Sequence, residues 1–343
     1  MSIVTAPREI QLMIFGQLEV SDLLSVSETC HRLKEVARDP SLWRQVSLTY
    51  QKVKNNNEAC RNHVIRCSSI QEIFITGDEK TIRSDKIMNV VMKANKDTLT
   101  TISLSPKFAG LSNSSFEKIE EMTNLTHIAV GGGKLKEEGM ESLACLTELR
   151  SLKIPGIMNG SIPMAKLENL FSQLKKLEEV EIIMDRRFPS DEVVESLVNN
   201  NPNLHHLDIS SSRRPSFYIN PILSSRSLIL IADTCPQLTY IGIGNLTMFS
   251  SNDILKLVTK CPKLKHANFK RTNIDDAALA MIPENCPDLE YLNIIGCYDH
   301  RISVDAVDRL EQSRPNLKIV EEEEEEYMII GPEPEPQLFC SLM

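Results

Sequence analysis

The sequence predicts an α/β solenoid, a curved array of strand–turn–helix units with a concave parallel β-sheet and outer helices. The first observation is a trio of apolar residues, spaced as Leu289, Leu292 and Ile294, that recurs through most of the chain. The second is the amphipathic stretch that separates one trio from the next. A strand unit of this kind cannot bury its apolar face alone, so the units must stack on one another.

The trio recurs about every 26 residues, which is the L-x-x-L-x-L pattern of leucine-rich repeats. About ten copies predict an array over residues 46–320. Val46 and Leu48 have the same alternation, so we expect a further strand there that joins the preceding segment to the array. The first apolar position of the ten copies is held by Ile70, Leu99, Leu125, Leu149, Leu177, Leu204, Leu238, Leu264, Leu289 and Leu317.

Helices are expected between the strands, for example over residues 253–261 and 275–282, with Asn252 and Asp275 as their N-caps. Cys235, Cys261 and Cys286 each precede a proline at one repeat position, where we expect small buried side chains. The chain has nine cysteines, an odd number that favours a reducing cytoplasmic or nuclear setting.

The formal net charge of −9 is concentrated at the C-terminal end, because residues 321–343 hold eight acids and no Lys or Arg. The rest of the chain is nearly neutral, so its composition is not that of a nucleic-acid-binding protein. We also expect neither a signal peptide nor a transmembrane helix, since no basic segment precedes an apolar run and no apolar run is long enough.

Residues 1–45 predict a small module of three helices. Pro7 suits a helix start, and Ile10, Ile14 and Leu18 follow as an apolar stripe. Ser21 is the expected N-cap of the second helix, and Pro40 follows the third. Helices this short cannot close a core of their own. They form either a cap over the open end of the array or a docking module for a partner.

The order of residues in this module closely resembles the F-box motif over about 40 residues, with Pro7, Cys30 and the pair Leu42-Trp43 at the spacing of the motif. One departure is Ala6, where the family usually has Leu. The resemblance implies docking onto a Skp-family adaptor, and through it onto the cullin and RING subunits of a ubiquitin ligase. It assigns that contact, or its support, to Pro7, Ile10, Ile14, Leu18, Leu24, Val26 and Trp43. The Cys-Pro pairs of the later repeats likewise look like the cysteine-containing repeat subclass common in F-box proteins.

The residues between the apolar strand positions should point outward from the concave face. At the third position of the last units stand His206, Tyr240, His266 and Tyr291, and the fifth position, which includes Glu181 and Asp208, is expected to be solvated. Aromatic residues on strands often reflect strand propensity alone. The alternative is a substrate-binding face weighted to the C-terminal half.

Basic residues follow several strands of the C-terminal half, in loops that share one rim. A scattered solvated surface is one interpretation. The other is a basic edge that accepts an acidic or phosphorylated protein substrate, because Arg forms paired charge-assisted hydrogen bonds. The candidates on this rim are Arg186, Arg213, Arg214 and Arg271.

Residues 321–343 predict a disordered acidic tail, because six consecutive glutamates are followed by alternating Glu and Pro. The tail either improves solubility or binds transiently to the basic rim. It ends Cys340-Ser-Leu-Met, which fits a C-a-a-X prenylation box with farnesyl as the favoured lipid. Some F-box/leucine-rich-repeat proteins end this way. One lipid beside acidic neighbours would give only weak, reversible membrane association.

No motif for catalysis or for a cofactor is evident in the sequence. The stretch Gly131-Gly-Gly lacks the Lys-Ser/Thr of a phosphate loop, and Tyr240 lies between His206 and His266 in strand order, which disfavours a shared metal ion. We therefore expect no enzyme and no cofactor. The leading hypothesis is a substrate-recognition subunit of a Skp–cullin–F-box ligase that acts by positioning. The alternative is a repeat scaffold or inhibitor without ubiquitination, and residues 7–43 discriminate between the two.

Overall fold

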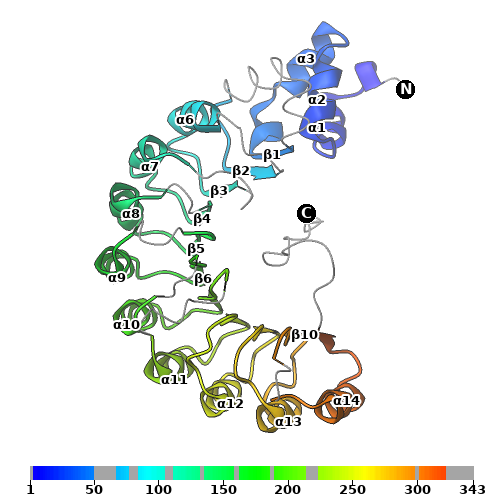
Figure 1. The fold of residues 1–343 in the computed structure, drawn as a ribbon. Helices are drawn as coiled ribbons and strands as arrows, with labels where there is room; N and C mark the ends of the chain where they lie inside the picture. Colours follow the sequence, from blue (N-terminus) through cyan, green and yellow to red (C-terminus); the bar gives the residue numbers. More distant parts are fainter. Residues whose placement is uncertain are drawn as a thin grey trace.

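The computed structural model describes residues 3–49, 67–76, 84–104, 111–131, 135–157, 162–185, 189–213, 223–297 and 301–321. The chain forms an arch in which one sheet lines the inner side and the helices of the repeats form the outer side (Figure 1). The N-terminal helices lie at one end of the arch and α14 at the other. This is the predicted α/β solenoid.

The N-terminal module consists of short helices packed around Trp43. Its elements are η1 (Ile3–Thr5), α1 (Arg8–Phe15), α2 (Val20–Ser27), α3 (His31–Ala37) and η2 (Pro40–Trp43). The Trp43 side chain is 1% exposed, and its Nε1 donates to Ala37 O at 2.7 Å, so the indole is both buried and hydrogen-bonded. The prediction of Ser21 as N-cap is wrong. Glu19 occupies the cap, because α2 already begins at Val20.

The sheet contains eleven parallel strands in sequence order. The buried residues Val46, Ile73 and Ile102 pair in register across β1–β3, and the same register continues to the last strand. The strands are β1 (Gln45–Thr49), β2 (Glu72–Thr76), β3 (Thr101–Leu104), β4 (His127–Ala129), β5 (Ser151–Lys153), β6 (Glu179–Glu181), β7 (His206–Asp208), β8 (Tyr240–Gly242), β9 (His266–Asn268), β10 (Tyr291–Asn293) and β11 (Lys318–Val320).

Strand β1, expected around Val46 and Leu48, connects the N-terminal module to the array. It pairs with β2 from Gln45 opposite Glu72 onward, and α2 contacts it. Trp43 and Val46 belong to the same cluster of buried side chains as Ile70 and Ile73. The module and the repeats therefore share one continuous core, which fixes the orientation of one relative to the other.

One helix on the outer side follows each strand from β2 to β10. The helices are α6 (Ser84–Ala94), α7 (Asn113–Ile119), α8 (Glu137–Ala144), α9 (Met164–Gln173), α10 (Asp191–Asn200), α11 (Ser225–Thr234), α12 (Ser251–Lys260), α13 (Asp276–Asn285) and α14 (Val304–Ser313). Asp275 caps α13 as predicted. The predicted cap Asn252 is wrong, because a capping box between Ser250 and Asp253 starts α12 earlier.

The predicted burial of Cys235, Cys261 and Cys286 is confirmed, since each is at most 1% exposed. Their thiols point at the preceding unit: Cys261 Sγ lies 3.8 Å from Cys235 O, and Cys286 Sγ lies 3.7 Å from Cys261 O. Burial raises the pKa of Cys261 to about 12 and that of Cys286 to about 11. These thiols therefore remain protonated and serve as packing groups.

Asn201 holds the same repeat position with a full amide bridge. Its Oδ1 accepts from Leu177 N at 2.8 Å, and its Nδ2 donates to Leu174 O at 2.9 Å and Leu197 O at 3.0 Å. The side chain is 2% exposed, so water cannot replace these bonds. One residue thus satisfies the backbone of the turn that enters β6 and links two units.

Asn201→Ala should lower the free energy of unfolding by about 2–4 kcal/mol, because it leaves buried donors and acceptors unpaired. Thermal unfolding followed by circular dichroism would measure this as a lower Tm. Asn200→Ala is the matched control, since the Asn200 amide donates only within its own helix, to Ser196 O. Equal losses in the two variants would contradict the bridging role.

Candidate binding surfaces

An apolar patch on α1 is the clearest exposed hydrophobic feature of the N-terminal module. Ile10, Met13 and Ile14 are 45%, 69% and 44% exposed, and their spacing puts them on one helix face. They account for half of the large hydrophobic side chains recorded as exposed among the described residues, and the others are isolated on different elements. A contiguous patch of this kind is a docking surface in search of an apolar partner.

The residues assigned by resemblance divide into contact and support. Ile10 and Ile14 lie in the exposed patch, and Pro7 is exposed directly before α1. Leu18 and Val26 are partly buried and pack against the core. The remaining two, Leu24 and Trp43, are buried, so they can only support a contact from within.

Gln11 supports the patch in a way that sequence reasoning missed. It is 1% exposed, and its Nε2 donates to Ile3 O at 2.7 Å. The bond attaches η1 to the hidden side of α1, opposite the exposed stripe. A single Gln among apolar residues at helical spacing carries no signal for such a role, because it depends on where the preceding turn folds.

The four predicted rings do form a row on the inner face. His206 and Tyr240 stack with centroids 4.1 Å apart, and Tyr240, His266 and Tyr291 continue the row at 6.4 Å and 6.1 Å. The rings therefore pack largely against one another, and their faces are not all available to a ligand. Tyr240 in particular donates its hydroxyl to Asp208 Oδ2 at 3.0 Å, which makes it a structural residue of this surface.

The expectation that the fifth strand position is solvated is wrong at β6 and β7. Glu181 is 5% exposed and Asp208 4%, because Lys153, His206 and Tyr240 cover them. Lys153 Nζ lies 3.2 Å from Glu179 and 3.1 Å from Glu181, and His206 Nε2 lies 2.9 Å from Glu181. The middle of the inner face is thus a set of charges that neutralise one another.

The pKa values follow from this pairing. Burial alone would raise the pKa of Glu181, but His206 and Lys153 outweigh it and hold the pKa below its ordinary value. Asp208 has no cation of its own. Burial therefore raises its pKa, and the neighbouring charge of Glu181 adds to the effect. The two carboxyls of adjacent strands are thus shifted in opposite directions.

Gly242 makes room for the Asp208 carboxyl. A Cβ added at Gly242 would lie 2.2 Å from Asp208 Cγ, a distance that no side chain can occupy. The carboxyl lies over β8, where Oδ1 accepts from Ser210 N at 2.8 Å. The glycine is therefore explained by its neighbour across the sheet rather than by a turn.

The rim residues are only partly described. Arg186 and Arg214 lie outside the described residues, as does Cys340. Arg213 follows β7, is exposed, and lies 3.5 Å from Asp185 Oδ1. Arg271 follows β9, and its side chain passes over Gly296. Arg213 and Arg271 thus share an edge of the sheet but belong to units two strands apart.

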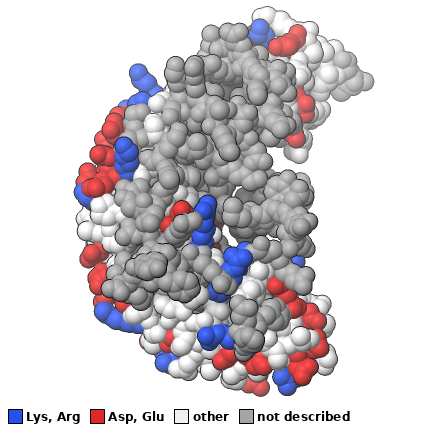
Figure 2. Space-filling view, viewed as in Figure 1, with Lys and Arg blue, Asp and Glu red and all other residues white. Residues whose placement is uncertain are grey.

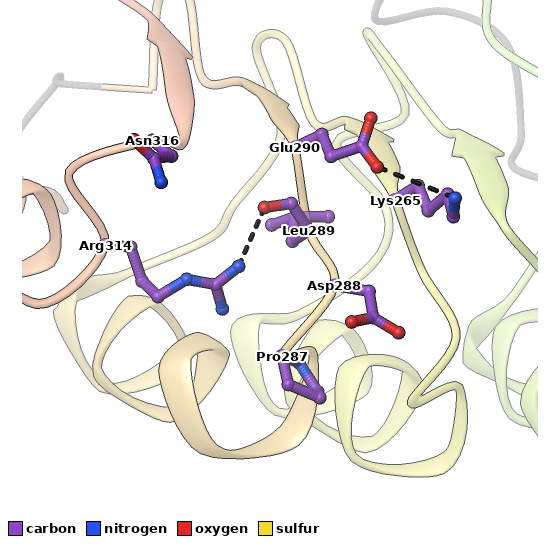
Figure 3. Close-up of a pocket in the computed structure, with 7 residues that line it drawn as sticks. All are labelled: Lys265, Pro287, Asp288, Leu289, Glu290, Arg314 and Asn316. Carbon is purple, nitrogen blue, oxygen red and sulfur yellow. Dashed lines mark hydrogen bonds and ion pairs between the residues drawn. The ribbon is translucent and has the colours of Figure 1, made fainter.

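A shallow pocket of about 350 Å³ lies on the opposite edge, where the chain enters the last strands (Figure 3). It is bordered by the Lys265–Glu290 ion pair at 3.6 Å. Arg314 donates to Cys286 O at 3.0 Å and to Leu289 O at 2.9 Å, doing at this repeat position what Asn201 does earlier. These cations already have partners in the chain, so the pocket is an inter-repeat crevice.

Two further searches of the described residues gave no site. They contain no group of three or more His, Cys, Asp or Glu side chains placed to hold a metal ion. None of the helices in these ranges combines the length and the apolar character needed to cross a membrane. What remains as functional surface is the α1 patch, the inner face of the sheet and the rim that carries Arg213 and Arg271.

Asp208→Asn should raise Tm at pH 8, because the folded chain no longer ionises a buried carboxyl there. A raised folded-state pKa means that Asp208 contributes its full stability below its ordinary pKa of 3.8 and loses it as the pH rises. The gain should be about 1 kcal/mol or more at pH 8 and should vanish at acid pH. Melting curves across pH test this, with Asp185→Asn, a half-exposed and ion-paired carboxylate, as a control that should show no gain. A loss of stability at pH 8 in Asp208→Asn would refute the sign.

Comparisons with known proteins agree with this architecture. In the solved structures, a chain from the complex of Rad7 and Elc1 in yeast matches with a TM-score of 0.55 at 13% identity, covering 91% of this chain and 92% of that one. A Bacteroides fragilis protein gives a TM-score of 0.44 at 16% identity, with 84% and 78% covered. A leucine-rich-repeat protein of Leptospira interrogans gives 0.34 at 14% identity, with 84% and 98% covered.

At such identities the likeness to solved structures concerns the fold alone. The F-box-like family matches residues 7–49, which comprise α1–α3, η2 and β1. The match includes the exposed stripe of Ile10 and Ile14 as well as the buried Trp43. The chain therefore consists of an F-box-like domain followed by a parallel-strand solenoid with outer helices.

Proposed function

We propose that this protein is a non-catalytic substrate adaptor of a Skp–cullin–F-box ubiquitin ligase. The observation that carries the proposal is the F-box-like match at residues 7–49, whose first helix presents an exposed apolar stripe. An F-box-like domain implies a Skp-like adaptor, and through it the cullin and RING subunits. The yeast chain of similar fold belongs to a complex of Rad7 with Elc1, so a solenoid of this shape is compatible with stable partner binding.

The rest of the chain would capture a protein substrate by its inner face and rim. Its part in catalysis is then positioning. A substrate held at one end of the arch reacts as if at high local concentration near the transfer enzyme recruited at the other. The shared core of module and array supports this role, because a fixed orientation preserves the distance between the two ends. The repeat scaffold or inhibitor remains the competing function, and a test of adaptor binding decides between them.

Ile10→Asp/Ile14→Asp should abolish binding to a purified Skp-like adaptor, because a desolvated apolar contact cannot accommodate two unpaired carboxylates. We expect at least a hundredfold loss of affinity in calorimetric titration, while Tm stays near the wild-type value since both side chains are exposed. These exposed positions are better targets than Leu24, whose truncation would disturb the core.

The matched control is Val304→Asp, which places the same charge on an exposed apolar position of α14, remote from the F-box-like domain. It should leave adaptor binding unchanged. Cullin should be recovered with the wild type and with Val304→Asp, but not with the double variant. Absence of adaptor and cullin from the wild-type sample would favour the scaffold or inhibitor function instead.

We also propose farnesylation of Cys340, on the sequence of the last four residues alone. Incubation of the full chain with farnesyltransferase and labelled farnesyl diphosphate should label the wild type and not Cys340→Ser. The exposed Cys30 and Cys145 serve as internal controls for nonspecific labelling. Label that survives in Cys340→Ser would exclude this site.

A further inference from the structure

The inner face of the sheet changes its chemistry between β7 and β8. On β5–β7 the third and fifth strand positions include the carboxylates of Glu179, Glu181 and Asp208, which are covered and bonded within the chain. From β8 to β11 the same positions hold no carboxylate. They carry rings, amides, one glycine, Lys318 and Val320. The C-terminal part of the inner face therefore offers hydrogen-bond donors without competing acids.

Two asparagines at the fifth position supply donors of fixed direction. Asn268 Oδ1 accepts from Lys270 N at 3.2 Å, and Asn293 Oδ1 accepts from Ile295 N at 3.1 Å. Each oxygen is thereby turned toward the backbone, and each Nδ2 points away from it. Both side chains are half-buried, and within the described ranges neither Nδ2 has a hydrogen-bond acceptor. The two amides lie on adjacent, directly paired strands.

The fold does not require an amide at this position. Asp208 makes the same turn with its carboxyl oxygen, which accepts from Ser210 N at 2.8 Å. An Asp at 268 or 293 would thus keep the turn and lose only the outward N–H groups. The choice of Asn over Asp matters to whatever meets the inner face rather than to the backbone.

Arg271, at the rim beside these amides, carries a second signal. Its φ of 52° lies in the left-handed region, which costs an ordinary side chain about 1–2 kcal/mol. The equivalent residues of other units are Asn245 and Gly296, with φ of 63° and 67°, both residue types that tolerate this conformation. An arginine here is retained against backbone preference, which points to a role for its side chain.

The guanidinium also has space reserved for it. The Arg271 side chain lies across Gly296, where an added Cβ would be 2.8 Å from Arg271 Cγ. Lys270 precedes it on the same loop and is half-buried. Figure 2 shows Lys and Arg side chains in the hollow of the arch, while many Asp and Glu side chains lie over the outer helices.

We propose that the inner face of β9 and β10, with Arg271 at its rim, binds an acidic segment of a partner protein. Asn268 Nδ2, Asn293 Nδ2 and the cations of Lys270 and Arg271 donate to its anionic oxygens, and Arg271 determines the preference for charge. Carboxylate and phosphate oxygens both fit this donor set. The partner is the captured substrate if the proposed ligase function holds, but the binding chemistry does not depend on it.

Fluorescence polarisation on the full-length chain tests the site with three labelled peptides of equal length: one rich in Glu, its Gln counterpart, and one with phosphoserine in place of Glu. The variants are Asn268→Asp/Asn293→Asp and Arg271→Asn. Asn252→Asp adds a charge to the exposed outer face of α12 and is the control. Tm is recorded for each variant, and Arg271→Asn should match or exceed the wild type because Asn suits the left-handed conformation.

The wild type should bind the Glu or the phosphoserine peptide saturably, with affinity that falls as salt rises, and should bind the Gln peptide at least tenfold more weakly. The stronger of the two acidic peptides identifies the source of the anion. Asn268→Asp/Asn293→Asp should weaken binding about a hundredfold and Arg271→Asn about tenfold, since each charge-assisted bond contributes about a factor of ten or more. Asn252→Asp should bind as the wild type does.

Equal binding of the Gln and Glu peptides, unchanged binding in both site variants, or an equal loss in Asn252→Asp would overturn the proposal. So would the absence of saturable binding both in the wild type and in a full-length variant with Glu321–Glu326 changed to Gln. Stronger binding in that variant would show that the acidic tail competes for the same donors, which supports the site. Adaptor binding, measured in parallel, should be unaffected, so failure here and failure of the ligase function are distinguishable.

Discussion

The structure depends on one constraint: no strand of this chain can bury its apolar face without the next. A three-residue strand such as Tyr291–Asn293 has only Leu292 and its flanking leucine and isoleucine to cover, and the neighbours in register cover them. The pairing is parallel throughout, so each unit repeats the same offset and the arch follows from accumulation. The polar closures obey the same constraint. Asn95, Asn201 and Arg314 differ in chemistry, yet each satisfies backbone groups of the turn that precedes its own strand.

The spacing of apolar residues was sufficient to predict the strands, because burial at alternate positions is what that spacing encodes. It predicted β1 from Val46 and Leu48 before any partner strand was known. Helix starts were less predictable. Ser250 and Asn252 are both good capping residues, and only the reciprocal bonds between Ser250 and Asp253 decide between them.

The candidate site was predicted less well, since its properties arise between strands. Glu181 and Asp208 stand at positions that alternate outward, yet neighbouring side chains cover them. Burial of this kind depends on which residues meet across the sheet, and a single strand does not reveal it. The conformation of Arg271 was hidden for a similar reason. Aligning the units places it between Asn245 and Gly296, and that comparison is the one signal in the sequence that could have exposed it.

The continuous core from Trp43 into the first repeats has a consequence for geometry. If strands advance about 4.8 Å each, the eight steps from β1 to β9 separate the F-box-like end from the donor surface by about 40 Å along the sheet. The number of repeats then acts as a molecular ruler. Loss or gain of one unit would shift and rotate whatever is held at the far end without altering a single contact residue, so selection on reach can act through repeat count while recognition stays unchanged.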